Sequence, residues 1–500
     1  MSLRIKHILP ILVLIGAIFL RFYRFEEFIT FLGDQGRDAI IIKRIITFEH
    51  FPAIGPPSSI GQIYLGPFYY YLVSPFLLLF KSNPLGLALA VGFFSLLGII
   101  ASYFIVKQEF KITFALIFFV FVAFSKTLIQ QSRFSWNPNL LPFFAFLTLY
   151  FFSQMLTRGA MIWAILVGAF LSFSIQLHHL AFLLFIPIIA GYLSFRIYFG
   201  ISFKQILNRV QDDFVKILVS LFSFLLFSLP LVIFDLRHNF LNSRNLIKFL
   251  FEQSPAGSEN VVARILETNT VFYSHLLQIN VNKYLSLIFT LLIFIFLIKK
   301  VEIKRHLFLF INLVSFVSYL LLFSLFNTSR IAHYFNPVYL SFYLIVTFVL
   351  LNFSKKGVIR IVLVFLAITP YLYFNLKALD YLLAARGNNQ IQIAEIIADS
   401  ILNQSPKTPY QTVALPYVET DGHVRYFLEI KGSRPLPADT LANPRELYIL
   451  CFEKDPDRPI GGCRVLGNPQ WQIAAFYNAK IAKIWEVEGV IIYKLIHIDN

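Results

Sequence analysis

The chain has 500 residues, of which 57% are hydrophobic and only 14% are charged. This composition leaves too little polar surface to cover a water-soluble globule of that size, so lipid must solvate much of the protein. The formal net charge of +16 would suit a nucleic-acid partner, but Lys and Arg occur in short loops beside apolar runs and form no contiguous patch. We therefore expect membrane lipids, and no nucleic acid, as partners.

Apolar runs recur along most of the chain, each about 17 to 22 residues long, which is the length of a helix that crosses ~30 Å of hydrocarbon. The runs do not alternate between apolar and polar residues, which excludes a membrane β-barrel. The pattern predicts an all-α polytopic membrane protein with about eleven transmembrane helices. The predicted helices lie near residues 8–23, 85–106, 112–125, 139–156, 160–177, 179–198, 215–234, 284–299, 306–326, 334–352 and 358–375.

The first apolar run has the basic start of a signal peptide, because Arg4 and Lys6 precede Ile8–Leu20. The run ends in Arg21-Phe-Tyr-Arg24 and has no small-residue cleavage site, so we interpret it as a retained first helix with a cytoplasmic N-terminus. From that start, basic residues gather in the inner loops, in agreement with the positive-inside rule. These residues are Lys107, Lys111, Arg158, Arg196, Lys204, Arg209, Lys216, Lys299, Lys300, Lys304, Arg305, Lys355, Lys356 and Arg360.

The apolar stretch Tyr64–Phe80 is nearly long enough to span the membrane. A crossing there would move the later basic clusters to the outer side, so we assign the stretch as a re-entrant or interfacial helix in a first outer loop, residues 24–84. The odd number of helices then places the C-terminus outside the cytoplasm. The expected location is the plasma membrane, which is the inner membrane of a bacterial-type cell.

We divide the chain into a transmembrane domain, residues 1–380, and a soluble extracytoplasmic domain, residues 381–500, in which no spanning run remains. The second part has helical spacing at Gln390–Leu402, strand-like runs at Thr412–Val418 and Leu447–Phe452, and a hairpin pattern around Glu488-Gly489. A small α/β domain is expected. Its Cys451 and Cys463 either pair in a disulfide or remain two free structural thiols.

The familiar motifs of ATP-driven transporters and metalloproteases are missing, since the sequence has no Walker A loop, HExxH helix or CxxC pair. Asp455-Pro-Asp457 has the spacing of the metal-binding pair of soluble nucleotide-sugar transferases, but its Pro-rich surroundings favour a turn. We expect no metal ion and no other cofactor.

Polar residues concentrate in the first outer loop, immediately beside lipid. The segment Gly33–Asp38 contains Asp34, Arg37 and Asp38 shortly after the first membrane helix. This order would place a carboxylate base next to an anion site. Alternatively, Asp34 only caps a helix that begins at Gln35, with Asp38 in its first turn.

Cationic and aromatic residues continue this loop. Lys43 and Arg44 either bind an anion or snorkel toward lipid head groups. Tyr69, within the aromatic run Tyr69–Tyr71, belongs either to a ligand site or to an interfacial aromatic belt.

Three further clusters fall on the same outer side in this topology. The paired histidines His178 and His179 interrupt an apolar stretch, where a polar pair marks either a surface turn or a cavity. The other two clusters either bind a phosphate or anchor helix ends at the interface. They are Arg133 with Trp136-Asn-Pro138, and Arg330 with His333, Tyr334 and Phe335.

With these features, the sequence resembles a polyprenyl-phosphate-sugar-dependent glycosyltransferase of the C superfold (GT-C), in the family 39 and protein O-mannosyltransferase-like group. Lipid A aminoarabinose transferases and rhizobial lipopolysaccharide core transferases are similar. The resemblance rests on the helix order, on the acidic residue soon after the first helix, and on the segments Gly33–Asp38 and Gly66–Tyr71.

The resemblance implies that Asp34 is the general base. It also implies transfer of a sugar, with inversion, from a polyprenyl phosphate to a glycolipid, polysaccharide or protein acceptor outside the cytoplasm. Candidates for substrate binding are Arg37, Asp38, Lys43, Arg44, Tyr69, Arg133, His178, Arg330, His333 and Tyr334. Protein mannosyltransferases commonly have Glu where Gln35 stands here, so the acceptor class remains open.

Two other functions compete with this one. A transporter or flippase of lipid-linked sugars would need polar residues near the bilayer midplane and broken helices in two related halves, and neither pattern is evident. A membrane scaffold whose outer domain binds partners is the third hypothesis.

Overall fold

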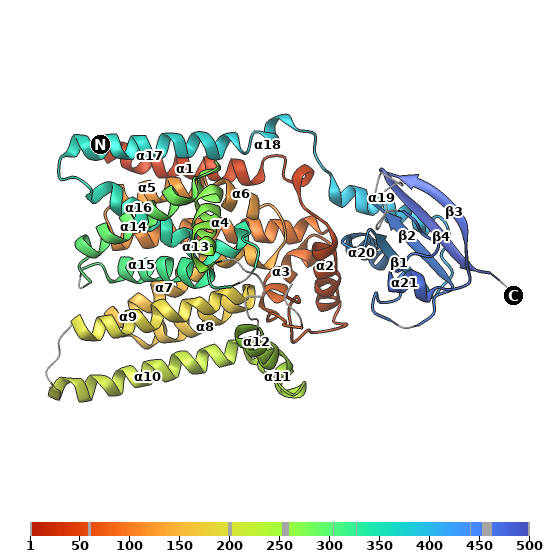
Figure 1. The fold of residues 1–500 in the computed structure, drawn as a ribbon, viewed down its shortest axis with the longest axis horizontal. Helices are drawn as coiled ribbons and strands as arrows, with labels where there is room; N and C mark the ends of the chain where they lie inside the picture. The colour runs from red at the N-terminus through yellow and green to blue at the C-terminus, as the bar shows by residue number, and fades with distance from the viewer. Residues whose placement is uncertain are drawn as a thin grey trace.

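The computed structural model describes residues 3–58, 62–198, 203–252, 260–303, 305–326, 328–440, 442–452 and 463–498. The predicted Asp455-Pro-Asp457 turn lies outside these residues. Figure 1 shows a bundle of long helices that run roughly side by side, with a separate small sheet at one end of the bundle. The short helices α2 and α3 lie at the end of the bundle that faces the sheet.

The helical part occupies the chain up to residue 384. Its elements are α1 (Leu3–Phe22), η1 (Glu26–Phe28), α2 (Gly33–Ile46), α3 (Phe68–Leu79), α4 (Leu85–Glu109), α5 (Ile112–Ala123), α6 (Lys126–Gln131), η2 (Asn137–Leu140), α7 (Leu141–Arg158), α8 (Met161–Leu177), η3 (His179–Leu184), α9 (Phe185–Tyr198), α10 (Phe203–Phe227), α11 (Leu229–Arg237), α12 (Leu241–Glu252), α13 (Val261–Leu277), α14 (Lys283–Lys300), α15 (Leu307–Phe323), η4 (Ala332–Val338), α16 (Tyr339–Asn352), α17 (Gly357–Lys377) and α18 (Tyr381–Ala384).

Helices occupy every predicted membrane span, and the chain is a multi-pass membrane protein. Among the described residues, 5 helices are long and apolar enough to cross a membrane, or 6 if the bent pair α10–α11 is one span. Several shorter apolar helices, such as α1, α5, α8 and α15, lie beside them in the bundle. The number of membrane crossings, about eleven, and the side on which each terminus lies remain predictions.

The span predicted over residues 215–234 is wrong as a single straight helix. The chain bends by 67° between α10 and α11. Pro230 stands in the first turn of α11, where its ring cannot continue a preceding helix. The bend is held by hydrogen bonds from Gln176 Nε2 to the carbonyl of Phe227, at 2.9 Å, and between the hydroxyls of Ser228 and Ser172, at 2.8 Å.

Helix α13 was not predicted, and it runs across the bundle, not along it (Figure 1). Its sequence includes Arg264, Glu267 and Asn269, which made it too polar to qualify as a span. Near its C-terminal end, the carbonyl of His275 accepts a hydrogen bond from Thr127 Oγ1 at 2.9 Å. Nearer the middle of the helix, Asn269 Oδ1 accepts from Thr290 Oγ1 at 2.7 Å.

Helix α3 covers most of the ambiguous stretch Tyr64–Phe80 and has only 12 residues. A helix of that length rises about 18 Å, well short of the ~30 Å hydrocarbon core. It packs between α2 and α4, and the chain reverses directly after it through Lys81 and Ser82, both at positive φ. The assignment of this stretch as an interfacial or re-entrant helix stays a prediction.

The C-terminal part is a small mixed sheet with helices, as predicted. Strand order is β1-β2-β4-β3, with β1 parallel to β2 and the remaining pairs antiparallel. The elements are α19 (Gln390–Leu402), β1 (Tyr410–Leu415), α20 (Gly422–Ile430), β2 (Glu446–Cys451), α21 (Trp471–Ala475), β3 (Ala479–Val487) and β4 (Val490–His497).

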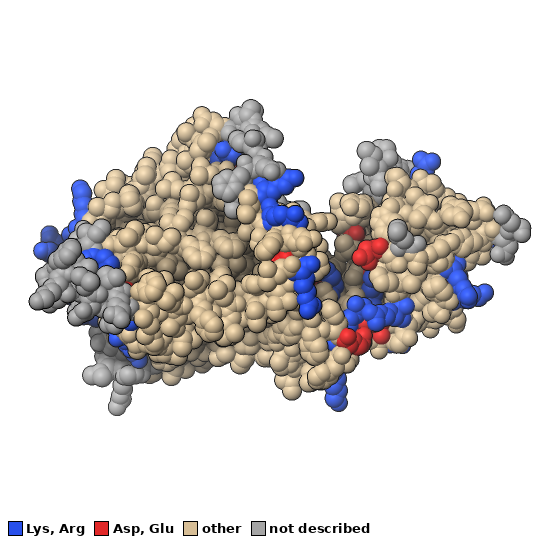
Figure 2. Space-filling model, turned by 90° about the horizontal axis from the view of Figure 1, so that it is seen from below, with Lys and Arg blue, Asp and Glu red and all other residues tan. Residues whose placement is uncertain are grey.

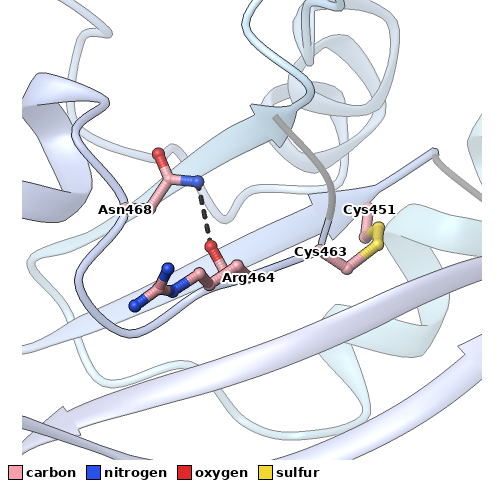
Figure 3. Close-up of a disulfide and its surroundings, with 4 residues drawn as sticks. All are labelled: Cys451, Cys463, Arg464 and Asn468. Atoms are coloured by element: carbon pink, nitrogen blue, oxygen red, sulfur yellow. Dashed lines mark hydrogen bonds between the residues drawn. A yellow bond between two sulfur atoms is a disulfide. The ribbon is translucent and has the colours of Figure 1, made fainter. Parts of the chain in front are cut away.

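Cys451, the last residue of β2, is joined to Cys463 by a disulfide (Figure 3). Of the two alternatives that the sequence left open, the structure has the disulfide. Bonds of this kind persist in oxidising compartments, which agrees with the predicted location of this part outside the cytoplasm.

The division predicted at residues 380 and 381 falls at the start of α18, whose Leu382 packs against Ile129 of the helical part. We propose that the soluble unit begins a few residues later, near Asn389, where α19 starts.

The sheet part is docked on α2 through a contact between backbones. A Cβ atom on Gly36 would overlap the backbone of Gly422 and His423 in α20, so only glycine permits this approach. Around the contact, Arg44 forms a bidentate ion pair with the nearly buried Glu429 of α20, with N–O distances of 3.1 and 2.9 Å. Figure 2 shows basic and acidic side chains at the hollow where the two parts meet.

This contact predicts that Gly36→Ala loosens the docking. The added methyl group meets backbone atoms that cannot move independently, and overpacking of this kind costs about 1–3 kcal/mol. We expect a lower melting temperature of the full chain in detergent and faster tryptic cleavage after Arg386, which is exposed in the connection before α19.

The matched control is Gly357→Ala, because a Cβ at Gly357 meets only the tip of Arg360 at 4.0 Å. This variant should leave both readouts unchanged. Equal cleavage rates for the Gly36 variant and the unmodified chain would show that the glycine contact does not hold the two parts together.

Candidate active site

Helix α2 presents Asp34 at its first turn, where the positive end of the helix dipole favours a carboxylate. The helix starts at Gly33, and Gln35 Oε1 accepts a hydrogen bond from the backbone of Leu32 at 3.0 Å. The alternative that Asp34 caps a helix beginning at Gln35 is therefore wrong. The Asp34 side chain is 54% exposed, so a substrate can reach it.

Arg37 lies between two carboxylates. Its Nη1 donates to Asp34 Oδ1 at 2.8 Å, while Nε and Nη2 donate to Asp38 Oδ1 at 3.0 and 2.9 Å. Burial alone would lower the pKa of Arg37, but the two carboxylates and Tyr70 raise it, so the guanidinium stays charged. Three donors in fixed directions give Arg37 a single orientation.

Asp38 is fully buried and holds the guanidinium of Arg37 in place. Its Oδ1 also accepts a hydrogen bond from the hydroxyl of Tyr70 at 2.9 Å, and Oδ2 has no hydrogen-bond partner among the described residues. Burial raises the pKa of Asp38, and the ion pair with Arg37 opposes that rise. Asp38 thus holds Arg37 and is not accessible to a substrate.

Above Asp34 and Arg37 lies a cavity of about 310 Å³, which we call the Asp34 cavity. It joins segments that are far apart in the sequence, namely the first outer loop, the turn before α7, the α8–η3 turn and η4. The lining residues are Asp34, Arg37, Pro56, Pro57, Ser58, Leu65, Trp136, Asn137, Pro138, His178, His179, His333 and Tyr334.

His178 and His333 form the polar wall of the Asp34 cavity, with ring centres 5.8 Å apart. The Nδ1 atom of His178 accepts a hydrogen bond from the backbone of Leu180 at 3.2 Å, so the neutral ring carries its proton on Nε2. Burial, together with the neighbouring histidines, lowers the pKa of His178 well below its ordinary value. His178 is therefore an N–H donor without charge at neutral pH.

Side-chain amides hold these segments in place. Asn137 Nδ2 donates to the carbonyl of Leu177 at 2.6 Å, directly before His178. Asn336 Nδ2 donates to the carbonyl of Pro138 at 2.6 Å, which ties η4 to the same turn. These buried bonds fix the loop backbones that carry Trp136 and His333.

The structure thus brings together five of the predicted site residues, Asp34, Arg37, His178, His333 and Tyr334, with Asp38 directly behind them. Tyr69 lies elsewhere: it is fully buried, and its hydroxyl bonds to Ser135 Oγ at 2.6 Å. It anchors α3, and belongs neither to the cavity wall nor to an exposed aromatic belt.

Lys43 and Arg44 do not line the Asp34 cavity. Lys43 pairs with Glu49, and both Lys43 and Arg44 face Glu429 of α20. Their cationic groups hold the C-terminal part on α2. Neither alternative from the sequence, a ligand anion or lipid head groups, therefore describes their contacts.

Arg133 and Arg330 are also absent from the cavity wall. Arg133 is buried and donates four hydrogen bonds, at 2.9 to 3.2 Å, to two carbonyls in the last turn of α1 and to two just after it. Arg330 donates to Thr268 Oγ1 at 3.3 Å and to carbonyls of its own loop. Both hold backbone segments together.

The candidates predicted from the sequence omit several residues of this site. The sequence did signal Trp136, Asn137 and His179, because each belongs to a cluster that was singled out on the outer side. Ser58 carries no such signal. Tyr70 stood within the aromatic run, but spacing alone could not tell which tyrosine faces Asp38.

The fold, a mostly helical membrane bundle with a small C-terminal mixed sheet, is similar to that of ArnT, which confirms the predicted fold class. No protein-family model and no curated protein matches the sequence. The similarity is therefore one of structure.

The chain is similar to ArnT from Cupriavidus metallidurans bound to undecaprenyl phosphate, with a TM-score of 0.58, 13% identity, and coverage of 98% of this chain and 97% of that one. It matches the apo state of that protein with a TM-score of 0.56, 13% identity and coverage of 97% of both chains. An Archaeoglobus fulgidus oligosaccharyltransferase tethered to an acceptor peptide has a TM-score of 0.48 and 15% identity over 88% of this chain and 65% of that one.

The buried triad of Arg37, Asp38 and Tyr70 makes a prediction about stability. Asp38→Ala should lower the free energy of unfolding by about 3–5 kcal/mol, because it leaves Arg37 with a single exposed partner and Tyr70 with none. Tyr70→Phe removes one hydrogen bond to a charged group and should cost about 1.5–3 kcal/mol. Thermal unfolding in detergent tests whether Asp38→Ala is less stable than Tyr70→Phe.

If the two variants melt at the same temperature, the buried carboxylate does not hold Arg37. Tyr71→Phe is the control, because the hydroxyl of Tyr71 donates to the uncharged carbonyl of Pro52 at 2.8 Å. It should lower the melting temperature less than Asp38→Ala or Tyr70→Phe does.

Proposed function

We propose that the protein is a membrane glycosyltransferase that moves a sugar from a polyprenyl phosphate to an acceptor outside the cytoplasm. The observation that carries the proposal is the accessible carboxylate of Asp34 in a cavity shared with Arg37, His178 and His333. Support also comes from the fold, since the similar ArnT structure contains undecaprenyl phosphate. A glycolipid, a polysaccharide and a protein all remain candidate acceptors.

In the proposed reaction Asp34 is the general base. An acceptor hydroxyl attacks the anomeric carbon and gives its proton to Asp34, while the bond from that carbon to the phosphate oxygen breaks. The electron pair of the broken bond leaves with the polyprenyl phosphate, and the configuration at the anomeric carbon is inverted. A positioned base of this kind contributes on the order of 10² to 10⁴-fold to the rate.

Arg37 and the histidine wall would bind the departing phosphate. Arg37 is the cation among the described residues that line the Asp34 cavity, and its two carboxylate partners hold it in one orientation. His178 would add an uncharged Nε2–H donor, and Tyr334 a hydroxyl. Hydrogen-bond donors fixed before the reaction stabilise developing charge without reorganising.

This function favours the predicted orientation in the membrane. The isoprenoid tail of the donor must lie in the bilayer while its sugar reaches the Asp34 cavity, so the cavity should lie at the outer membrane surface. We propose, accordingly, a cytoplasmic N-terminus and an extracytoplasmic C-terminal part. The disulfide between Cys451 and Cys463 agrees with this side.

Asp34→Asn tests the proposal directly. In vesicles that contain the full chain, a panel of undecaprenyl-phosphate sugars and an envelope extract as acceptor, the unmodified protein should release undecaprenyl phosphate. The variant should lose about 10²-fold or more of that rate, because Asn cannot accept the proton. Chromatography of the extracted lipids measures the release.

Glu26→Gln is the matched control, since Glu26 is another exposed acidic residue of the first outer loop and lies outside the Asp34 cavity. It should keep the full rate. Movement of the lipid-linked sugar across the vesicle with no release of undecaprenyl phosphate would indicate a flippase, and full activity of a well-folded Asp34→Asn chain would remove Asp34 from the role of base.

A further inference from the structure

A second, larger cavity lies at the opposite end of the bundle from Asp34. Its volume is about 1100 Å³, above the ~300–1,000 Å³ typical of small-molecule pockets. It is lined by α5, α16 and α17 and by the loop that precedes α15. We call it the inner-end cavity, because the predicted topology places this end at the cytoplasmic surface.

The cavity arises from uneven attachment of α17. Toward its C-terminal end, Tyr371 donates a hydrogen bond to the carbonyl of Phe121 in α5 at 2.7 Å, and Asn375 accepts from the backbone of Lys126 at 2.8 Å. The N-terminal half has no comparable bonds among the described residues, and side chains such as Ile361 and Phe365 are 71% and 65% exposed. The helix is therefore held at one end and stands apart from α5 at the other.

The mouth of the inner-end cavity is basic. Lys111, Arg305 and Arg360 come from three separate elements and line the same space. All three are exposed, and none has an ion pair or a side-chain hydrogen bond within the part of the chain that the structure describes. Figure 2 shows basic side chains gathered at this end of the helical part.

Just one acidic residue lines the cavity in the described part of the chain. Glu109 Oε1 accepts a hydrogen bond from Gln154 Nε2 at 2.7 Å and is partly buried at the end of α4. The balance of charge at the mouth is therefore positive. Below the mouth the walls are apolar, with Phe114, Ile117 and Val364 among the lining residues.

We propose that the inner-end cavity binds an anionic phospholipid of the bilayer. Its phosphate would contact Lys111, Arg305 and Arg360, and its acyl chains would fill the wedge between α5 and α17. Basic pockets between membrane helices on the cytoplasmic side recognise anionic head groups in this way. The positive-inside rule accounts for basic residues at this end, but it requires neither their convergence nor an apolar cavity beneath them.

The occupant is a bilayer phospholipid and not the sugar donor. The donor's phosphate must lie beside its sugar, at the Asp34 cavity, and the two cavities lie at opposite ends of the long helices. One phosphate cannot occupy both. The inner leaflet is also the leaflet that carries an excess of anionic lipid in many membranes.

Native mass spectrometry of the full chain in uncharged detergent tests the inference. With phosphatidylglycerol and phosphatidylcholine of the same acyl chains at equal concentration, the protein should retain phosphatidylglycerol. The triple variant Lys111→Ala, Arg305→Ala, Arg360→Ala should bind it about 100-fold less tightly, since each cation near a lipid phosphate contributes about fivefold. The single variant Arg360→Gln should bind phosphatidylglycerol about fivefold less tightly. It provides the test if the triple variant does not fold.

The matched control removes three basic residues from the same end of the bundle that do not line the cavity. Lys299→Ala, Lys300→Ala, Lys355→Ala should bind phosphatidylglycerol as the unmodified chain does. If this control loses as much affinity for phosphatidylglycerol as the triple cavity variant, the binding is due to general surface charge and the proposal fails. Equal retention of the two lipids by the unmodified chain would also overturn the proposal.

A third arm adds undecaprenyl phosphate as a competitor. If it displaces phosphatidylglycerol at equal concentration, and Arg360→Gln weakens its binding too, the cavity belongs to the isoprenoid lipid and the proposal fails. None of these measurements requires sugar transfer, so their outcome is independent of the role of Asp34.

Discussion

The arrangement of the candidate active site depends on one buried charge. A carboxylate without water costs several kcal/mol unless partners satisfy it, and Arg37 and the hydroxyl of Tyr70 supply partners for Asp38 Oδ1. The same contacts fix α2 against α3 and turn the guanidinium toward Asp34. The buried carboxylate of Asp38 therefore fixes the guanidinium of Arg37, while the exposed carboxylate of Asp34 stays at the cavity wall, where a substrate can reach it.

Most of the fold could be predicted from hydrophobic run length and the distribution of Lys and Arg. These signals found the helices at the predicted spans, because lipid imposes a minimum length on a helix that crosses it. They failed where a helix does not cross the membrane. The crosswise α13 is held by polar contacts with its neighbours, which a local window does not contain. The break at Ser228 has a local signal in Pro230, but the hydrogen bond that holds it comes from Gln176 of another helix.

The candidate site was predictable in its residue types and less so in their roles. Asp34, Arg37 and the histidines stood out because polar residues beside lipid are costly. The same argument selected Arg133, which in fact satisfies carbonyls at the end of α1, and Lys43, which pairs with Glu49. A cation that binds a ligand and one that holds two segments together look alike in a sequence, because the partner carboxylate or carbonyl lies far along the chain.

The C-terminal part is more than an appendage to the bundle. It touches α2 through Gly36 and Gly422, on the helix that carries Asp34, and it holds that helix again through Glu429. Helix α2 has only 14 residues, too few to be stable alone in water, so its position is set by what packs on it. The bundle supplies one contact surface through α3 and the C-terminal part supplies the other. The geometry of the Asp34 cavity is therefore a joint property of both, and a change in either part should alter it.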